Sequence, residues 1–172
     1  MGPRLRRFAL TVHIIASVGW LGAVLPYIVL DVVAATSRDP ATLRAAYLAM
    51  HLVAAYAIVP LAIAAVVTGL IMSLGTKWGL LRHYWVVVSL VLTLLATVVL
   101  FIEMRVIRFY ADVAGDSGSS GADIVALGNT LFHSVGGTLV LLVVLVLNVY
   151  KPRGLTRYGW RKQEQERARA TP

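Results

Sequence analysis

The chain has four histidines, and each lies near the start of a different long apolar segment: His13, His51, His83 and His133. The sequence has no cysteine. This excludes thiolate metal sites, iron–sulfur clusters and covalently attached haem. A neutral imidazole remains as a ligand for haem iron or another metal. The chemistry of the chain therefore depends on which histidines face the same space.

We expect His51 and His133 to lie toward the outer side of a membrane, and His13 and His83 toward the cytoplasmic side. In an up-down bundle, the second and fourth helices are diagonal partners across the core. If the fourth helix starts near Leu127, His51 and His133 have matching depths, as two axial ligands of a b-type haem require.

Small residues follow three of these histidines by about one helical turn. Gly136 and Gly137 follow His133 in this way and could leave room for a flat macrocycle. In the first apolar segment one helix face carries most of the polar atoms, and we expect it to point into the bundle: His13, Ser17, Trp20, Tyr27 and Asp31. Small residues in membrane helices also serve close packing, and histidines near helix ends are often interfacial groups, so both interpretations stay open. His83 has no small neighbours and is the weakest candidate.

Two carboxylates lie within the apolar segments, Asp31 and Glu103. Ionisable groups at membrane depth are costly and are functional candidates for that reason. Both lie near the outer boundary, where Arg105 or water could pair with them. The sequence leaves two interpretations, a structural ion pair and a path for protons or cations.

Copper handling is the competing chemistry, because Met50 lies next to His51 and Met72 and Met104 provide other thioethers. Thioether and imidazole ligands suit Cu(I). Adjacent residues on a helix do not share a face, however, so Met50 and His51 are poorly placed to hold one ion.

These residues must be positioned by apolar segments, because 59% of the 172 residues are hydrophobic and only 14% are charged. A helix needs about 20 residues to cross the hydrocarbon core. The sequence predicts an all-α integral membrane protein, an up-down bundle of four spans at about 8–35, 45–74, 84–107 and 131–150. Pro26 and Pro60 lie inside spans and predict kinks.

The cations predict the orientation, since cytoplasmic loops are enriched in Lys and Arg. They precede the first span, lie between the second and third, and follow the fourth, so we expect both termini in the cytoplasm. The formal charge of +8 then reflects topology and contact with anionic lipids, not nucleic-acid binding.

Outside the bundle, two segments are expected to lack regular structure. The loop from Asp112 to Asp123 is rich in Gly, Ser and Asp and is expected to be mobile. A four-helix domain should cover 1–154, and the charged tail 155–172 is expected to be disordered.

Several motifs resemble known bacterial membrane families. His13 followed by Trp20, Gly22 and Leu25-Pro26 resembles the first helix of HemJ-type protoporphyrinogen oxidases and, more loosely, CopD-type copper resistance proteins. In the HemJ-type family the corresponding histidine is implicated in haem binding, which the resemblance assigns to His13. That family's lysine in the third helix is replaced by Ser89, and its Asn-Glu pair is missing around His133.

A further resemblance is to uncharacterised small bacterial inner-membrane proteins, carried by the two segments 68–85 and 149–154. Together the sequence favours a protein that binds a b-type haem or related porphyrin for electron transfer or haem handling, with a membrane redox partner or a second copy. The alternatives are a copper-handling or transport-related protein without enzymatic activity and a cofactor-free accessory subunit.

Overall fold

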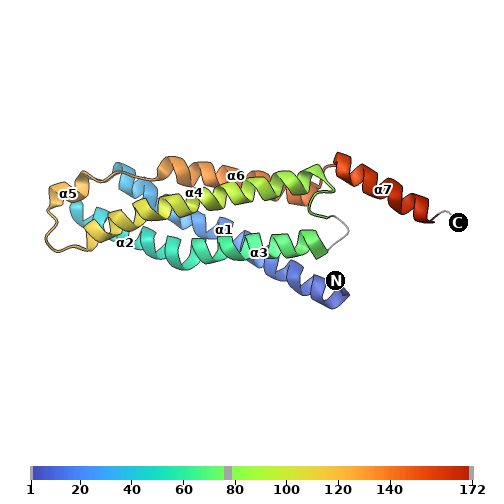
Figure 1. Cartoon of the computed structure of the whole chain (residues 1–172). Coiled ribbons are helices and arrows are strands. Elements are labelled where there is room, and N and C mark those ends of the chain that lie inside the picture. The colour runs from blue at the N-terminus through green and yellow to red at the C-terminus, as the bar shows by residue number, and fades with distance from the viewer. Residues whose placement is uncertain (1, 76–78, 171–172) are drawn as a thin grey trace.

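The computed structural model describes residues 2–75 and 79–170, and four long helical segments dominate these residues (Figure 1). They are α1 (Pro3–Thr36), the continuous run of α2 (Pro40–Val53), η1 (Ala54–Ile58) and α3 (Val59–Gly75), then α4 (Tyr84–Gly115) and α6 (Leu131–Tyr150). Each segment is long and apolar enough to span a membrane. The predicted all-α architecture of four spans is therefore confirmed.

Two short helices lie at opposite ends of the bundle. α5 (Gly121–Val125) caps one end, and α7 (Arg157–Ala170) projects from the other (Figure 1). Both chain termini lie at the end that carries α7, which we call the near end. We call the end that carries α5 the far end.

The four spans form a closed ring of neighbours. α1 and α4 each pack against the α2–α3 segment and against α6. The second and fourth spans are therefore the diagonal pair, as the up-down topology predicts. The polar face expected on α1 does point inward, because Trp20, Tyr27 and Asp31 are all buried.

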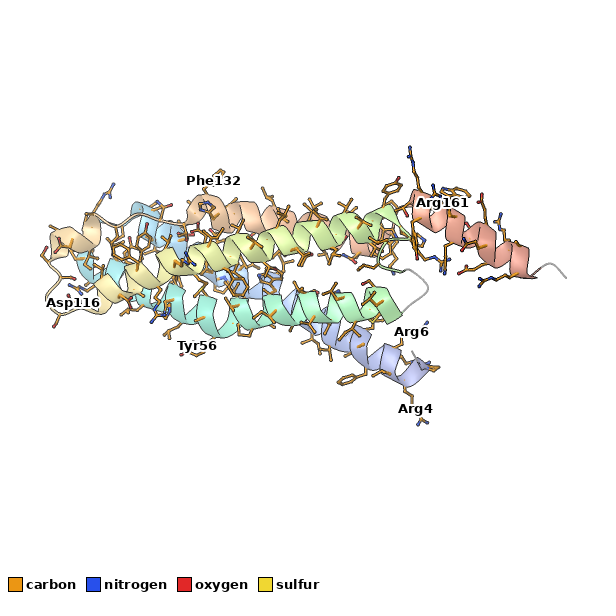
Figure 2. The ribbon with its side chains drawn as sticks, viewed as in Figure 1. Arg4, Arg6, Tyr56, Asp116, Phe132 and Arg161 are labelled. Carbon is orange, nitrogen blue, oxygen red and sulfur yellow. The ribbon has the colours of Figure 1, made fainter. Side chains whose placement is uncertain are left out.

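Large apolar side chains cover the outside of the bundle. Tyr56 and Phe132 are 78% and 85% exposed and point away from it, while Arg4, Arg6 and Arg161 project at the near end (Figure 2). None of the residues that the structure describes in α6 is buried. Such a surface is stable only against hydrocarbon, so the outer surface contacts the lipid bilayer.

The two prolines behave differently. Pro26 lies within α1, which continues through it as one helix. Pro60 is the second residue of α3, which begins directly after the π-helical turn η1. A proline donates no backbone hydrogen bond and crowds the preceding turn, which explains the wider turn there. The π-turn directs Ala54 and Ile58 into the core.

The segment from Asp112 to Asp123 is more ordered than we expected. α4 continues to Gly115, and Ser120 and Asp123 form a capping box for α5. The Ser120 hydroxyl and backbone N–H hold the pKa of Asp123 below its usual value. Arg44 donates hydrogen bonds to the carbonyls of Ala114, Asp116 and Ser119, which connects α2 to this loop.

The charged tail also differs from the expectation, because it forms α7. The backbone N–H of Gly159 donates a hydrogen bond to the Thr156 hydroxyl, which caps the start of this helix. Glu166 forms a 2.8 Å ion pair with Arg82 from the loop before α4. Helix-forming residues with opposite charges one turn apart support the remainder of the helix.

Candidate ligand cavity in the far half of the bundle

A cavity of about 340 Å³ lies in the far half of the bundle and draws its walls from all four spans. Its volume is within the range of small-molecule sites, roughly 300–1,000 Å³. Most of the lining is apolar. The lining residues are Trp20, Val24 and Tyr27 of α1, Ala54 and Ile58 of η1, Leu92, Leu95, Ala96, Val99, Leu100, Glu103 and Ile107 of α4, and Thr130, Phe132, His133, Ser134, Gly136, Gly137, Val140 and Leu141 of the fourth span and its cap.

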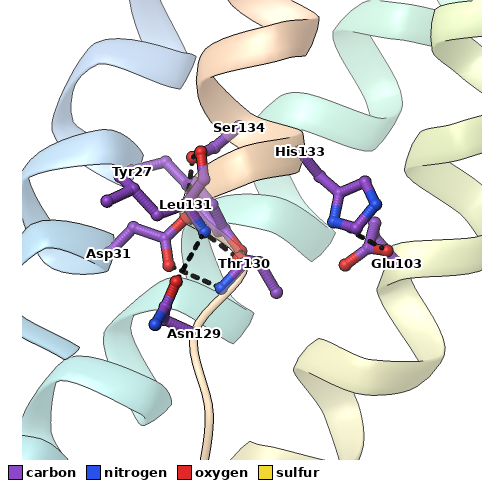
Figure 3. A network of polar contacts seen from close by, with 8 residues as sticks. All are labelled: Tyr27, Asp31, Glu103, Asn129, Thr130, Leu131, His133 and Ser134. Atoms are coloured by element: carbon purple, nitrogen blue, oxygen red, sulfur yellow. Dashed lines mark hydrogen bonds and ion pairs between the residues drawn. The ribbon is translucent and has the colours of Figure 1, made fainter. Parts of the chain in front are cut away.

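The polar atoms of this cavity gather near its far end, around the first turn of α6. There, Nδ1 of His133 lies 3.3 Å from a carboxylate oxygen of Glu103 on α4 (Figure 3). The Glu103 side chain is 14% exposed, and the His133 side chain is 48% exposed. Glu103 therefore pairs with His133, and not with Arg105 as we had considered.

This pairing sets the chemistry of the His133 ring. A neutral imidazole that donates its Nδ1 hydrogen to a carboxylate keeps a lone pair on Nε2. The same arrangement orients histidines that bind metals and increases their basicity. In that tautomer, Nε2 of His133 would be available to bind an iron centre or to accept a hydrogen bond.

The two glycines of α6 border open space. A Cβ atom added to Gly136 or Gly137 would meet no other atom within 4 Å. Gly69 of α3 is different, because a Cβ there would lie 3.2 Å from Cε1 of His13. Gly136 and Gly137 therefore leave space at the cavity wall, whereas Gly69 permits close packing.

Asp31 supports the first turn of α6 from the side opposite Glu103 (Figure 3). One of its carboxylate oxygens accepts the backbone N–H of Thr130 at 2.9 Å. The other accepts the hydroxyls of Thr130 at 2.9 Å and Ser134 at 2.7 Å. Asp31 is fully buried, and these three donors compensate its carboxylate. The hydroxyl of Tyr27 joins the group at 2.7 Å from that of Thr130.

The structure brings only part of the predicted site together. Trp20, Glu103, His133, Gly136 and Gly137 line one cavity, whereas His51 is not among its lining residues. The inward positions next to His51 are Met50 and Ala54, both buried. The imidazoles of His51 and His133 therefore do not face each other across this cavity.

His13 belongs to a separate polar contact in the near half. Its Nδ1 lies 2.9 Å from the Thr68 hydroxyl on α3. His13 precedes Asp31 by 18 residues on α1, which corresponds to about 27 Å along the helix. Because Asp31 bonds to the turn that carries His133, one ligand could not contact both histidines. His83 precedes α4 and forms a β-bridge with Leu155 at the near end.

Thr130 and Ser134 are site residues that the sequence did not indicate, whereas Tyr27 lies on the face of α1 that was expected to point inward. Asp31 and Thr130 are 99 positions apart, and Thr130 lies just before the helix, so no local pattern connects them. The helix spacing of Tyr27 and Asp31 on one face was the available signal. Within the described ranges, no group of three or more His, Cys, Asp or Glu side chains could hold a metal ion.

In a comparison with protein families, residues 8–152 match a model described as "Predicted integral membrane protein (DUF2269)". No curated protein and no solved structure matches the chain. The matched residues include most of α1, the other three spans and every residue that lines the cavity.

Proposed function

The chain belongs to the DUF2269 family of predicted integral membrane proteins, and we propose that it binds a b-type haem or related porphyrin in the far-half cavity. The bound group would serve electron transfer or haem handling. The observation that carries this proposal is the His133–Glu103 pair at the wall of an apolar, intramembrane cavity. A carboxylate-oriented imidazole with a free Nε2 is a suitable axial ligand for haem iron.

The residues of the cavity fit a flat apolar group. Gly136 and Gly137 leave one wall open, and Ala54 and Ala96 contribute short side chains to other walls. The remaining lining is mainly leucine, valine and isoleucine, which exclude water from the macrocycle. When bound, a haem would supply one-electron chemistry, with the axial ligand and its hydrogen bond tuning the potential.

We propose a single axial ligand from the protein for the haem iron, His133, in place of the pair of His51 and His133 expected from the sequence. His51 is left out because it does not line the cavity. His13, to which the HemJ-type resemblance assigns haem binding, remains the rival position. Its ring already contacts Thr68 and packs against Gly69, which leaves less room for a macrocycle.

The proposed setting is the inner membrane of a bacterium, with both termini in the cytoplasm. The near end carries Arg4, Arg6, Arg7, Arg82 and the cations of α7, which favours this side as the cytoplasmic one. The cavity would then lie in the outer half of the bilayer. Electron transfer would also require a membrane redox partner or a second copy of the chain.

The experiment is a titration of the purified protein in detergent with haem b, metal-free protoporphyrin and Cu(I), each followed by absorbance and bound stoichiometry. The proposal predicts saturable binding of one haem per chain with a shifted Soret band. The variant Gly137→Phe, which fills the cavity, should abolish it. Copper bound at one per chain without porphyrin binding would instead support copper handling, and binding of neither would support a cofactor-free accessory subunit.

A further inference from the structure

We infer that the hydroxyl and carboxylate groups at the far end of the cavity present only hydrogen-bond acceptors and negative charge, so that the ligand group placed against them must be a hydrogen-bond donor or a cation. This inference depends on the proposed function only for the identity of the ligand.

The hydroxyl hydrogens of Thr130 and Ser134 point away from the cavity. Each hydroxyl has one hydrogen to donate, and both donate to the same oxygen of Asp31. The alternative acceptor for Ser134 is the carbonyl of Leu131 at 3.2 Å, which is also part of the protein. Both hydroxyls line the cavity, so their lone pairs are what remains available to a ligand.

The hydroxyl hydrogen of Tyr27 is also donated to another group of the protein. Because Thr130 donates to Asp31, the 2.7 Å contact between the two hydroxyls requires Tyr27 to be the donor. Tyr27 is buried and lines the cavity, and its oxygen keeps only lone pairs for a ligand.

Glu103 completes the set of acceptors. Its carboxylate lines the cavity and lies 3.3 Å from Nδ1 of His133. A carboxylate oxygen only accepts hydrogen bonds. The hydroxyls and the carboxylate at this end of the cavity are therefore acceptors toward its ligand.

The charges act in the same direction. Glu103 lines the cavity and the carboxylate of Asp31 lies directly behind Thr130 and Ser134. None of the residues that line the cavity is Lys or Arg. A ligand carboxylate or phosphate placed there would lose its hydration and meet the carboxylates of Glu103 and Asp31. A porphyrin would accordingly be held by its pyrrole N–H groups or its metal, and not by its carboxylates.

Two apolar probes of similar shape test this selectivity without haem: 1-aminomethylpyrene, which is cationic, and pyrene-1-carboxylate, which is anionic. Binding can be followed by energy transfer from the buried Trp20, with Trp20→Phe and Gly137→Phe as blanks. A charge-assisted hydrogen bond is worth about 1.5–3 kcal/mol, so the amine should bind at least ~10-fold more tightly.

The variant Asp31→Asn is the decisive test of the hydrogen-bond direction. The backbone N–H of Thr130 holds the amide oxygen in place, which puts the amide nitrogen against the two hydroxyls. That nitrogen donates two hydrogens, so the hydroxyls of Thr130 and Ser134 can no longer donate to this position and their hydrogens become available to the cavity. The preference for the amine should fall by about tenfold or more. A loss of stability alone would leave the preference unchanged.

The matched control is Asp39→Asn, which changes an exposed carboxylate that caps α2 outside the cavity. It should leave the preference unchanged. If Asp31→Asn does not fold, Glu103→Gln provides the same test, because it removes the charge that lines the cavity.

The outcomes separate this inference from the proposed function. Selective amine binding without porphyrin binding would support the inference and refute the haem proposal. Haem binding together with equal or tighter binding of pyrene-1-carboxylate would refute the inference alone. As a further check, the dimethyl ester of protoporphyrin should bind as tightly as the free acid, whereas much weaker binding of the ester would contradict the inference.

Discussion

The Nδ1 atom of His133 lies 3.3 Å from a carboxylate oxygen of Glu103, and this contact joins α6 to α4 at the far end of the cavity. The two residues are 30 positions apart in the sequence. On the opposite side of the same turn, Asp31 accepts hydrogen bonds from Thr130 and Ser134, which lie on either side of His133 in the sequence. The imidazole is therefore oriented by one carboxylate and carried on a turn that a second carboxylate fixes.

The first prediction concerns Glu103. Changing it to Ala removes the acceptor that orients His133, and partners of this kind typically change metal affinity by about 10- to 100-fold. Glu103→Ala should therefore weaken haem binding by about that factor, measured by titration. Glu103→Gln should have a smaller effect, because its amide oxygen can still accept the Nδ1 hydrogen. Equal affinity in wild type and Glu103→Ala would show that the pair does not support a ligand.

The second prediction contrasts Gly136, which borders open space, with Gly69, which permits close packing against His13. Gly136→Ala should keep or increase thermal stability, by up to about 1 kcal/mol, because Ala favours a helix and its Cβ meets no atom. Gly69→Leu should destabilise the protein by about 1–3 kcal/mol, since the His13 ring must move. Unfolding in detergent measures both. A large loss of stability in Gly136→Ala would instead identify a packing glycine and remove support for the ligand space.

The third prediction concerns Asp31 as the anchor of α6. Asp31→Ala leaves the N–H and hydroxyl of Thr130 and the hydroxyl of Ser134 without their acceptor in a buried place. The expected cost is about 1–3 kcal/mol of unfolding free energy, measured by denaturant titration in detergent. Asp112→Ala, at an exposed carboxylate of α4, is the control and should change stability little. Equal stabilities of the two variants would contradict the anchoring role.

The sequence was sufficient to predict the four spans, their antiparallel order and the inward face of α1, because apolar length and helical spacing decide these features. Within the site, local spacing indicated His133, Gly136 and Gly137, which lie within about one turn of α6 and line the same cavity. The sequence grouped Trp20 with His13 on one face of α1, and the structure places Trp20 in the wall of this cavity.

Contacts between helices could not be predicted in the same way. The rotation of α6 that pairs His133 with Glu103 depends on Asp31 and Thr130, which are far apart in the sequence. The exclusion of His51 depends on the rotation of α2, where Met50 occupies the inward position instead. In the tail, the ion pair of Glu166 with Arg82 and the cap by Thr156 involve the loop before α4, which the composition of the tail does not indicate.

The fourth prediction tests the proposed orientation. Reporter fusions at Ser37 and at Gly118 should be active outside the cytoplasm, and fusions after Lys77 or at the C-terminus should be active inside it. The reason is the concentration of Lys and Arg at the near end and in the loop between the second and third spans. The opposite pattern of reporter activity would place the cavity in the cytoplasmic half of the bilayer.

The most direct measurement of the central claim is a haem titration of the variants His133→Ala, His51→Ala, His13→Ala and His83→Ala, with absorbance spectra of the oxidised and reduced forms. If His133 is the axial ligand, only His133→Ala should abolish haem retention or replace the wild-type spectrum. His51→Ala should behave as wild type, since His51 does not line the cavity. Haem lost in His13→Ala but retained in His133→Ala would contradict the account and move the site to the near half of the bundle.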